Sequence, residues 1–182
     1  MAGSVVVVII VAIVIALLGP GLFSKDAAST TTTPTSSTST TTAAPLKSVA
    51  GKPCVATKGP LPKGAPAVPV QTGPPPTKLV IKDLKAGTGA VVKAGQSLNV
   101  DYIGVSCSTG VIFDSSYQRG QPAPLSLNSV IPGWQQGIPG MKVGGERLLG
   151  IPPKLGYGTQ GQPPTIAPDE TLWFVVHVLS AT

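Results

Sequence analysis

Aromatic, charged and chemically reactive side chains are scarce in this chain. Of its 182 residues, 4% are aromatic and 11% are charged, and His177 is the sole histidine. The two cysteines, Cys54 and Cys107, are too few for the Cys/His cluster that a structural zinc ion requires. No G-x-S-x-G sequence occurs, and His177 does not lie near both a nucleophile and an orienting acid. We therefore expect no metal ion, no cofactor and no hydrolytic triad.

Positive charge is in excess but is not concentrated. The formal net charge is +6, from 13 Lys and Arg against 7 Asp and Glu. Five of the basic residues precede residue 77, where Asp26 is the only acid, so the remainder of the chain is close to neutral. A nucleic-acid-binding protein shows a basic patch or stripe. Its absence excludes nucleic acid from the expected partners.

The first 24 residues predict a transmembrane anchor or a secretory signal. Residues 5–18 are uninterrupted apolar residues. Taken to Phe23, the segment approaches the roughly 20 residues of a spanning helix, whereas taken to Leu18 it has the length of a signal-peptide core. No small-x-small cleavage site directly follows, which favours a retained anchor over a cleaved signal. Lys25 follows the run and no basic residue precedes it, so charge does not fix the orientation.

Two segments of biased composition come next. Residues 25–51 are rich in Ser, Thr and Ala, which predicts a disordered linker. Such linkers are typical of exported and often O-glycosylated stalks, with an unmodified spacer as the alternative. Residues 52–76 contain eight prolines and predict a semi-rigid extended arm. We expect the remaining domain, residues 77–182, to lie outside the cytoplasm at the cell membrane, or to be secreted if the first segment is cleaved.

The two cysteines favour a disulfide bond in an oxidising compartment. Cys54 lies in the proline-rich arm and Cys107 in the turn at residues 106–110, so the bond would tie the arm to the domain. Two free thiols remain the alternative.

Residues 77–182 carry a β-strand pattern with one short helix. Leu98, Val100 and Tyr102 alternate with polar residues, and the last apolar segment alternates in the same way, which predicts strands with one face inward. Only residues 133–138 look helical. Because neither element buries an apolar face alone, we expect an α+β fold in which an antiparallel sheet curls around the helix. The expected strands begin at residue 79, run over 98–103, pass through Phe113, and cover 124–127, 146–151 and 171–179.

Six motifs give these residues a family resemblance. They occur in the order VDYIG at 100–104, FDSS at 113–116, VIPGW at 130–134, GMKVGG at 140–145, IPPKLGYG at 151–158 and LWF at 172–174. Together, and at this spacing, they resemble the FKBP family, the macrolide-binding peptidyl-prolyl cis-trans isomerases. The resemblance covers residues 77–182 and does not extend to residues 1–50.

The resemblance implies a five- or six-stranded curved antiparallel sheet around one short helix, with a pocket between them. Trp134 would form the pocket floor, and Ile131 N–H and the Tyr157 hydroxyl would donate to substrate carbonyl groups. Arg119 would hold Asp114 or Tyr102 in place, and Ile166 would belong to a flanking loop. The implied catalytic residues are Tyr102, Phe113, Asp114, Trp134, Tyr157 and Phe174, and the implied substrate-binding residues are Val130, Ile131, Ile166 and Arg119.

The residue types suit the rotation of an X-Pro peptide bond. The twisted transition state has lost amide resonance and is less polar than the planar form, so a dry aromatic pocket with fixed donors favours it. We expect an isomerase that assists the folding of exported proteins, binds proline-containing polypeptides and accepts macrolide inhibitors. A non-catalytic proline-peptide-binding module and a chaperone are the alternatives. Ala123, Gln162 and Thr165 depart from the family pattern at the pocket rim, which leaves the macrolide affinity open.

Two residues of the last strand are expected to point away from that pocket. His177 is expected to be solvated rather than to act as a base. Trp173 is expected on the same outward face, where it either packs on the proline-rich arm or marks a partner surface.

Overall fold

The computed structural model describes residues 46–182. The expected anchor or signal over residues 1–24 and nearly all of the expected linker over 25–51 therefore lie outside the described residues. Within the described part, no helix is long and apolar enough to cross a membrane.

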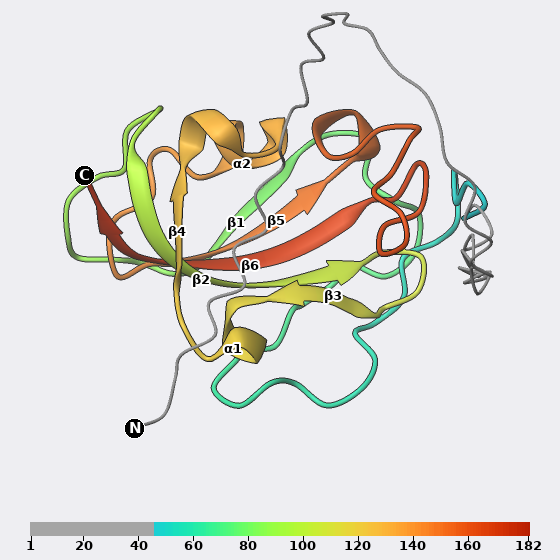
Figure 1. Ribbon diagram of the computed structural model, residues 1–182, viewed down its shortest axis with the longest axis horizontal. Helices are drawn as coiled ribbons and strands as arrows, with labels where there is room; N and C mark the ends of the chain where they lie inside the picture. Colours follow the sequence, from blue (N-terminus) through green and yellow to red (C-terminus); the bar gives the residue numbers. More distant parts are fainter. Residues whose placement is uncertain (1–45) are drawn as a thin grey trace, which may run out of the picture. The chain divides into compact units, whose positions relative to one another are not determined.

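An antiparallel sheet of six strands forms the body of the protein, as predicted (Figure 1). Its order is β1-β5-β6-β2-β3, and β4 pairs with β2 beside this path. Each expected strand is present, with ends shifted by at most three residues. The strands are β1 (Val80–Lys85), β2 (Ser97–Ser106), β3 (Ile112–Ser115), β4 (Ala123–Ser126), β5 (Glu146–Ile151) and β6 (Leu172–Ala181).

The predicted helix is α2 (Pro132–Gly137), which covers one face of the sheet (Figure 1). Pro132 suits its first turn because the missing N–H has no helical partner there. Glycine at 133 and 137 lets the helix lie directly on β5. A Cβ atom at Gly133 would lie 2.5 Å from Ile151 Cγ2, and one at Gly137 would lie 2.7 Å from Leu149 Cδ2.

A second helix, α1 (Ser116–Arg119), was not predicted. Its N-cap Ser115 accepts a hydrogen bond from Tyr117 N–H, and its C-cap Gly120 has the left-handed backbone conformation that favours glycine. Four residues are too few to show helical periodicity, so only the two caps identify it in the sequence. Two 3-10 turns, η1 (Leu127–Ser129) and η2 (Pro153–Leu155), complete the elements.

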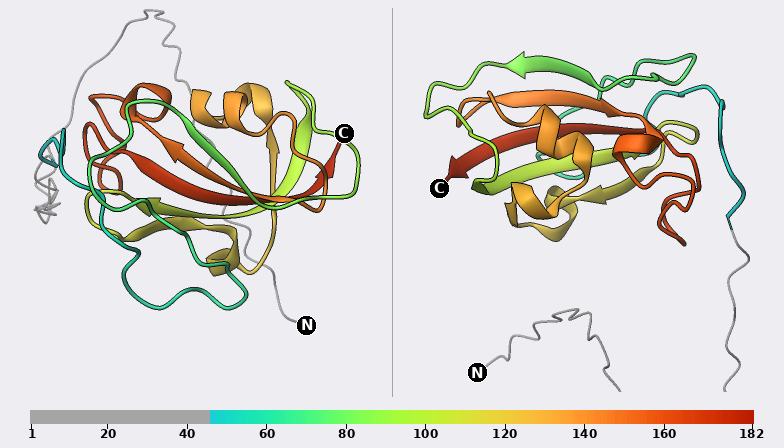
Figure 2. Two further views of the ribbon diagram at one scale, coloured as in Figure 1. Left: turned by 180° about the vertical axis from the view of Figure 1, so that it is seen from behind. Right: turned by 90° about the horizontal axis from the view of Figure 1, so that it is seen from above.

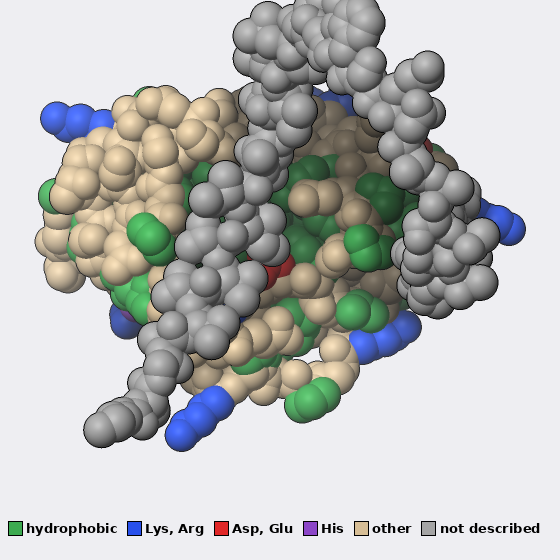
Figure 3. Space-filling view, in the orientation of Figure 1, with side chains coloured by type: hydrophobic (Ala, Val, Ile, Leu, Met, Phe, Trp, Pro, Cys, Tyr) green, Lys and Arg blue, Asp and Glu red, His purple; other side chains and the backbone are tan. Residues whose placement is uncertain are grey.

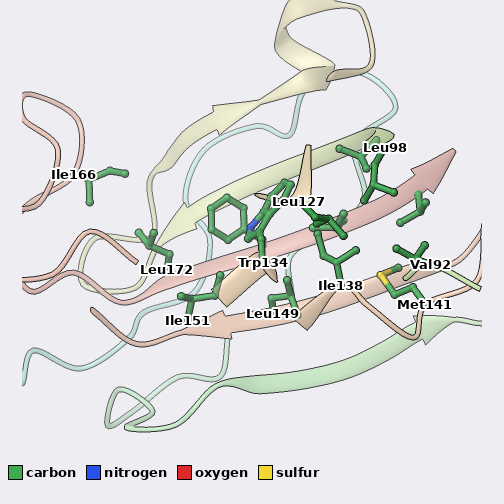
Figure 4. Close-up of a cluster of buried hydrophobic side chains, with 14 residues drawn as sticks. Val92, Leu98, Leu127, Trp134, Ile138, Met141, Leu149, Ile151, Ile166 and Leu172 are labelled. Atoms are coloured by element: carbon green, nitrogen blue, oxygen red, sulfur yellow. The ribbon is translucent and has the colours of Figure 1, made fainter. Parts of the chain in front are cut away.

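The main core lies between α2 and the sheet (Figure 4). Leu98, Val100 and Tyr102 of β2 point into it, as their alternation predicted. The same holds for alternate residues of β6, and all the β6 members are buried: Leu172, Phe174, Val176 and Val178.

The opposite face of the sheet is covered by the proline-rich arm, which runs along the side away from α2 (Figures 1 and 2). Trp173 points to this side, as expected, and the arm buries it completely. Its indole N–H lies 3.4 Å from Cys54 Sγ, and Val68 of the arm belongs to the same apolar cluster. Packing on the arm, rather than a partner surface, therefore accounts for Trp173. His177 lies on this face and is partly exposed.

The predicted disulfide bond joins Cys54 to Cys107, and both residues are buried. Backbone hydrogen bonds continue the attachment on either side of the bond. Val55 N–H donates to Cys107 O at 2.8 Å, and Lys58 N–H donates to Gly110 O at 2.7 Å. The arm is therefore fixed to the sheet by covalent, polar and apolar contacts together.

The double variant Cys54→Ala/Cys107→Ala should lose about 4 kcal/mol of unfolding free energy, because the bond closes a loop spanning 53 residues in the unfolded chain. Urea unfolding followed by circular dichroism measures this loss. Reductant should lower the stability of the unaltered protein to the same level and leave the variant unchanged. Equal midpoints for the two oxidised proteins would contradict the prediction.

Candidate functional site

A pocket of about 320 Å³ opens between α2, the neighbouring strands and the loop after β5. Hydrophobic side chains gather in a hollow between α2 and β3 in the space-filling view (Figure 3). The pocket brings together many of the predicted site residues, namely Tyr102, Asp114, Val130, Ile131, Trp134, Tyr157 and Phe174. Leu125 and Ser129 also line it and were not predicted, since neither belongs to a recognised motif.

Trp134 lies at the centre of the aromatic group. It meets Tyr102 edge to face, with ring centroids 5.4 Å apart, and Phe174 in the same way at 5.3 Å. Such T-shaped pairs add to the stabilisation from buried area. Trp134 is 5% exposed and comes from the helix, while its two neighbours come from β2 and β6, so this contact joins helix and sheet.

The indole nitrogen of Trp134 is buried and has no hydrogen-bond acceptor among the described residues. Buried polar groups are usually paired. The rings of Tyr102 and Phe174 lie against the Trp134 ring at near right angles. Aromatic ring surface, with no hydrogen-bond acceptor for the indole N–H among the described residues, therefore forms the floor of the pocket.

Phe113 and Ile166 support the pocket without lining it. Phe113 packs edge to face on Phe174, with centroids 5.4 Å apart. Gly104 makes this contact possible, because a Cβ atom there would lie 2.7 Å from both rings. Ile166 is buried in the main core and pairs with Gln162 in an isolated bridge at the flanking loop.

Arg119 organises the polar side of the pocket. Its Nη1 donates to Asp114 Oδ1 at 2.5 Å, and its Nη2 donates to the Tyr102 hydroxyl at 2.8 Å. The Tyr102 hydroxyl in turn donates to Asp114 Oδ2 at 2.5 Å. The family resemblance implied that Arg119 would hold Asp114 or Tyr102, and Arg119 contacts both. The short helix α1 makes this possible by turning the chain back within five residues.

Ser116 fixes the backbone beneath Tyr102 and was not predicted. It is fully buried, and its hydroxyl accepts a hydrogen bond from Tyr102 N–H at 2.9 Å and donates to Asp101 Oδ1 at 2.8 Å. Because Ser116 opens α1, this contact ties the helix that carries Arg119 to the strand that carries Tyr102.

Two donors at the pocket remain without a described partner. Neither the Ile131 N–H nor the Tyr157 hydroxyl forms a hydrogen bond with residues 46–182. Burial raises the pKa of Tyr157, and the negative charge of Asp114 raises it further. Tyr157 is therefore a protonated donor at neutral pH.

The residues that depart from the family pattern lie at the edge of the site. Ala123 on β4 is partly buried against the main core. Gln162 and Thr165 are exposed on the loop that flanks the pocket. These three residues therefore change the rim of the pocket and not the aromatic residues of its floor.

The fold and site define a class of protein: a curved antiparallel sheet that closes an aromatic pocket beneath one short helix. A family model, the FKBP-type peptidyl-prolyl cis-trans isomerase, matches residues 89–179. The chain belongs to this FKBP family, and the expected fold and isomerase function are confirmed at that level.

Curated relatives and solved structures agree with this assignment. The chain is 46% identical over 116 residues to a probable FK506-binding protein of Corynebacterium glutamicum, covering 64% of this chain and 98% of that protein. It is 48% identical over 118 residues to an FK506-binding protein of Streptomyces anulatus, covering 63% and 95%. It also resembles the crystal structure of FkpA from Escherichia coli, with a TM-score of 0.55 and 42% identity over 58% of this chain and 49% of that one.

Tyrosine ionisation should be delayed by folding, because Tyr102, Tyr117 and Tyr157 are the chain's three tyrosines and burial raises the pKa of each. For Tyr102 and Tyr117 the value rises to about 12. Phenolate absorbance of the native protein should therefore appear at higher pH than that of the protein in urea.

The same shifts predict a loss of stability in base. A pKa that is raised in the folded state contributes stability below the unfolded value of 10.0, and this contribution disappears as the pH rises towards about 12. Superimposed native and denatured absorbance titrations would contradict the shifts.

Proposed function

We propose that this chain catalyses X-Pro isomerisation in exported polypeptides, with the proline ring held over Trp134. Its membership of the FKBP isomerase family is established above, whereas the residue roles and the cellular location are our proposal. The observation that carries the roles is one pocket that combines an aromatic floor with two donors that have no described partner, Ile131 N–H and Tyr157 OH.

The chemistry follows from the electronic structure of the peptide bond. Resonance opposes rotation with a barrier of ~18–20 kcal/mol. In the twisted transition state the resonance is lost, so the amide is less polar than in either planar isomer. Moving the bond from water onto the ring faces around Trp134 therefore destabilises the planar ground state more than the twisted state.

The donors hold the substrate on either side of the rotating bond. The Ile131 N–H, at the start of α2, would donate to one flanking carbonyl group, and the Tyr157 hydroxyl would donate to another. Because both are fixed before substrate binds, they favour the twisted geometry without reorganisation of the site. Val130 would contribute apolar contact beside the first donor.

The Tyr102–Asp114–Arg119 group would act mainly by position. Asp114 accepts two hydrogen bonds from within the protein, and Arg119 neutralises its charge at the pocket wall. The Tyr102 ring is thereby held against Trp134. We propose that Phe174 completes the wall that receives the proline ring, with Phe113 packed behind it and Ile166 supporting the flanking loop.

An oxidising location is supported by the Cys54–Cys107 bond, because disulfides persist mainly in exported proteins. The apolar residues 5–18 and the Ser/Thr-rich segment after them support export as well. We propose that the domain works outside the cytoplasm, at the cell membrane through a retained N-terminal anchor.

Macrolide binding is proposed from the relatives named as FK506-binding proteins. The floor residue Trp134 and the donors are available to such a ligand. Ala123, Gln162 and Thr165 would change contacts at the rim, so they should tune affinity rather than abolish binding.

Tyr157→Phe should reduce kcat/KM for a Leu-Pro peptide about fivefold, because one hydrogen bond to the substrate is lost while the ring remains. Tyr117→Phe is the matched control, since Tyr117 does not line the pocket, and its rate should equal that of the unaltered protein. A coupled peptide isomerisation assay measures both, with a macrolide as the inhibitor control.

Two outcomes would count against these roles. Equal rates for Tyr157→Phe and Tyr117→Phe would remove Tyr157 as a donor. Macrolide binding without any acceleration by the unaltered protein would favour the alternative, a non-catalytic module that captures proline-bearing segments.

The location predicts the thiol state in the producing cell. Alkylation of freshly lysed cells should leave Cys54 and Cys107 unmodified unless reductant is added first. A variant that lacks residues 1–24 should remain in the cytoplasm and show two alkylated cysteines. Alkylation of both cysteines in the full chain without reductant would overturn the proposed location.

A further inference from the structure

A second cavity, of about 450 Å³, lies between the arm and the loop that carries Tyr157. The first residues of the arm, coloured cyan, run beside the loops that follow β5 (Figures 1 and 2). The cavity is larger than the catalytic pocket and shares no lining residue with it. Residues 49–52, where the arm begins, and 75–77, where it ends, line the cavity opposite residues 152–154, 158–159 and 169–171.

Hydrogen bonds hold the two sides of this cavity together. Ser48 Oγ donates to Asp169 Oδ2 at 2.6 Å, and Val49 N–H donates to Pro168 O at 3.0 Å. Asp169 has a φ of 61°, and it is the only described residue other than glycine with a positive φ. Its N–H donates to Gly158 O at 2.9 Å, next to Tyr157. The cavity is thus preformed, as ligand sites usually are.

The cavity walls are mainly apolar. Two pairs of prolines face it from the arm and from the loop after β5, with Val49 beside them: Pro75, Pro76, Pro152 and Pro153. Proline rings offer flat apolar surfaces that pack well on aromatic rings, the contact on which recognition of proline-rich peptides depends. The volume lies within the range of 300–1,000 Å³, roughly, of ligand pockets.

Four charged side chains line the cavity, two of them acidic and two basic. The Glu170 carboxylate is buried and accepts from Ser108 N–H at 2.9 Å and Ser108 Oγ at 2.7 Å, while Asp169 accepts from Ser48. Lys52 and Lys154 also line the cavity, and neither forms an ion pair with residues 46–182. The two ammonium groups are therefore the charged groups at the cavity that have neither a hydrogen bond nor an ion pair with residues 46–182.

We propose that this cavity binds an aromatic side chain of an extended polypeptide whose neighbouring residues are acidic. The ring packs between the prolines, and the acidic neighbours pair with Lys52 and Lys154. The site is independent of isomerisation, since it needs no proline in the ligand. The protein would therefore have a second binding site for a polypeptide, formed in part by Gly158 and Thr159 of the loop that carries Tyr157.

The test uses the full chain and fluorescein-labelled, proline-free peptides. We expect Gly-Glu-Trp-Glu-Gly to bind saturably by fluorescence anisotropy, and Gly-Gln-Trp-Gln-Gly and Gly-Glu-Ala-Glu-Gly to bind at least about tenfold more weakly. The double variant Lys52→Glu/Lys154→Glu should weaken the first peptide about tenfold, the size expected for two exposed charge pairs. Lys82→Glu/Lys93→Glu makes the same charge change away from the cavity and should leave binding unchanged.

Equal weakening by the two double variants would overturn the proposal, because the effect would then be one of net charge. Displacement of the peptide by a macrolide would also overturn it, because the peptide would then occupy the catalytic pocket. Saturable binding that a macrolide does not displace supports the second site even if the isomerase assay shows no activity.

Discussion

The edge-to-face contact of Trp134 with Tyr102 and Phe174 is the interaction on which the pocket depends. It seats the only helix of the main core on the sheet, and the same ring surface forms the floor of the pocket. The glycines at 133 and 137 serve this contact by letting α2 approach β5 without side chains between them. Folding stability and the apolar character of the pocket therefore depend on the same residue, because the Trp134 ring packs in the core and also lines the pocket.

A second constraint is that the central strands β2 and β6 are largely buried on both faces of the sheet. Alternate side chains of β2 and β6 belong to two separate clusters of buried hydrophobic residues, one beneath α2 and one beneath the arm. A sheet with only the helix would expose Trp173, Val175 and Ile103 to water. The arm removes that surface, and the Cys54–Cys107 bond keeps it in place. The proline-rich segment is thus part of the folded body, and it creates a cavity that the family-matched region alone would not contain.

The strands and the single core helix could be predicted because their patterns are local. Alternation in residues 98–103 and 171–179 fixed the two faces of β2 and β6, including the outward direction of Trp173. The short helix α1 was not predicted because four residues carry no helical period. The family resemblance implied that Arg119 holds Asp114 or Tyr102, and the turn made by α1 brings it to both. Leu125 and Ser129 were missed because nothing in their local sequence distinguishes them from ordinary core or turn residues. Ser116 belongs to the FDSS motif, but its hydrogen bonds to β2 depend on the fold.

The sequence by itself determined the order of the strands along the chain and the motifs of the FKBP family, and it favoured a disulfide bond between the two cysteines. Composition and spacing suffice for these, since each is a property of neighbouring residues or of a unique pair. The tertiary structure alone decided which side chains line one pocket, which hydroxyl groups donate hydrogen bonds to Asp169 and Glu170, and that the arm encloses a second cavity. These depend on contacts between residues far apart in the sequence, such as Ser108 with Glu170 and Ser48 with Asp169, which only the folded chain brings together.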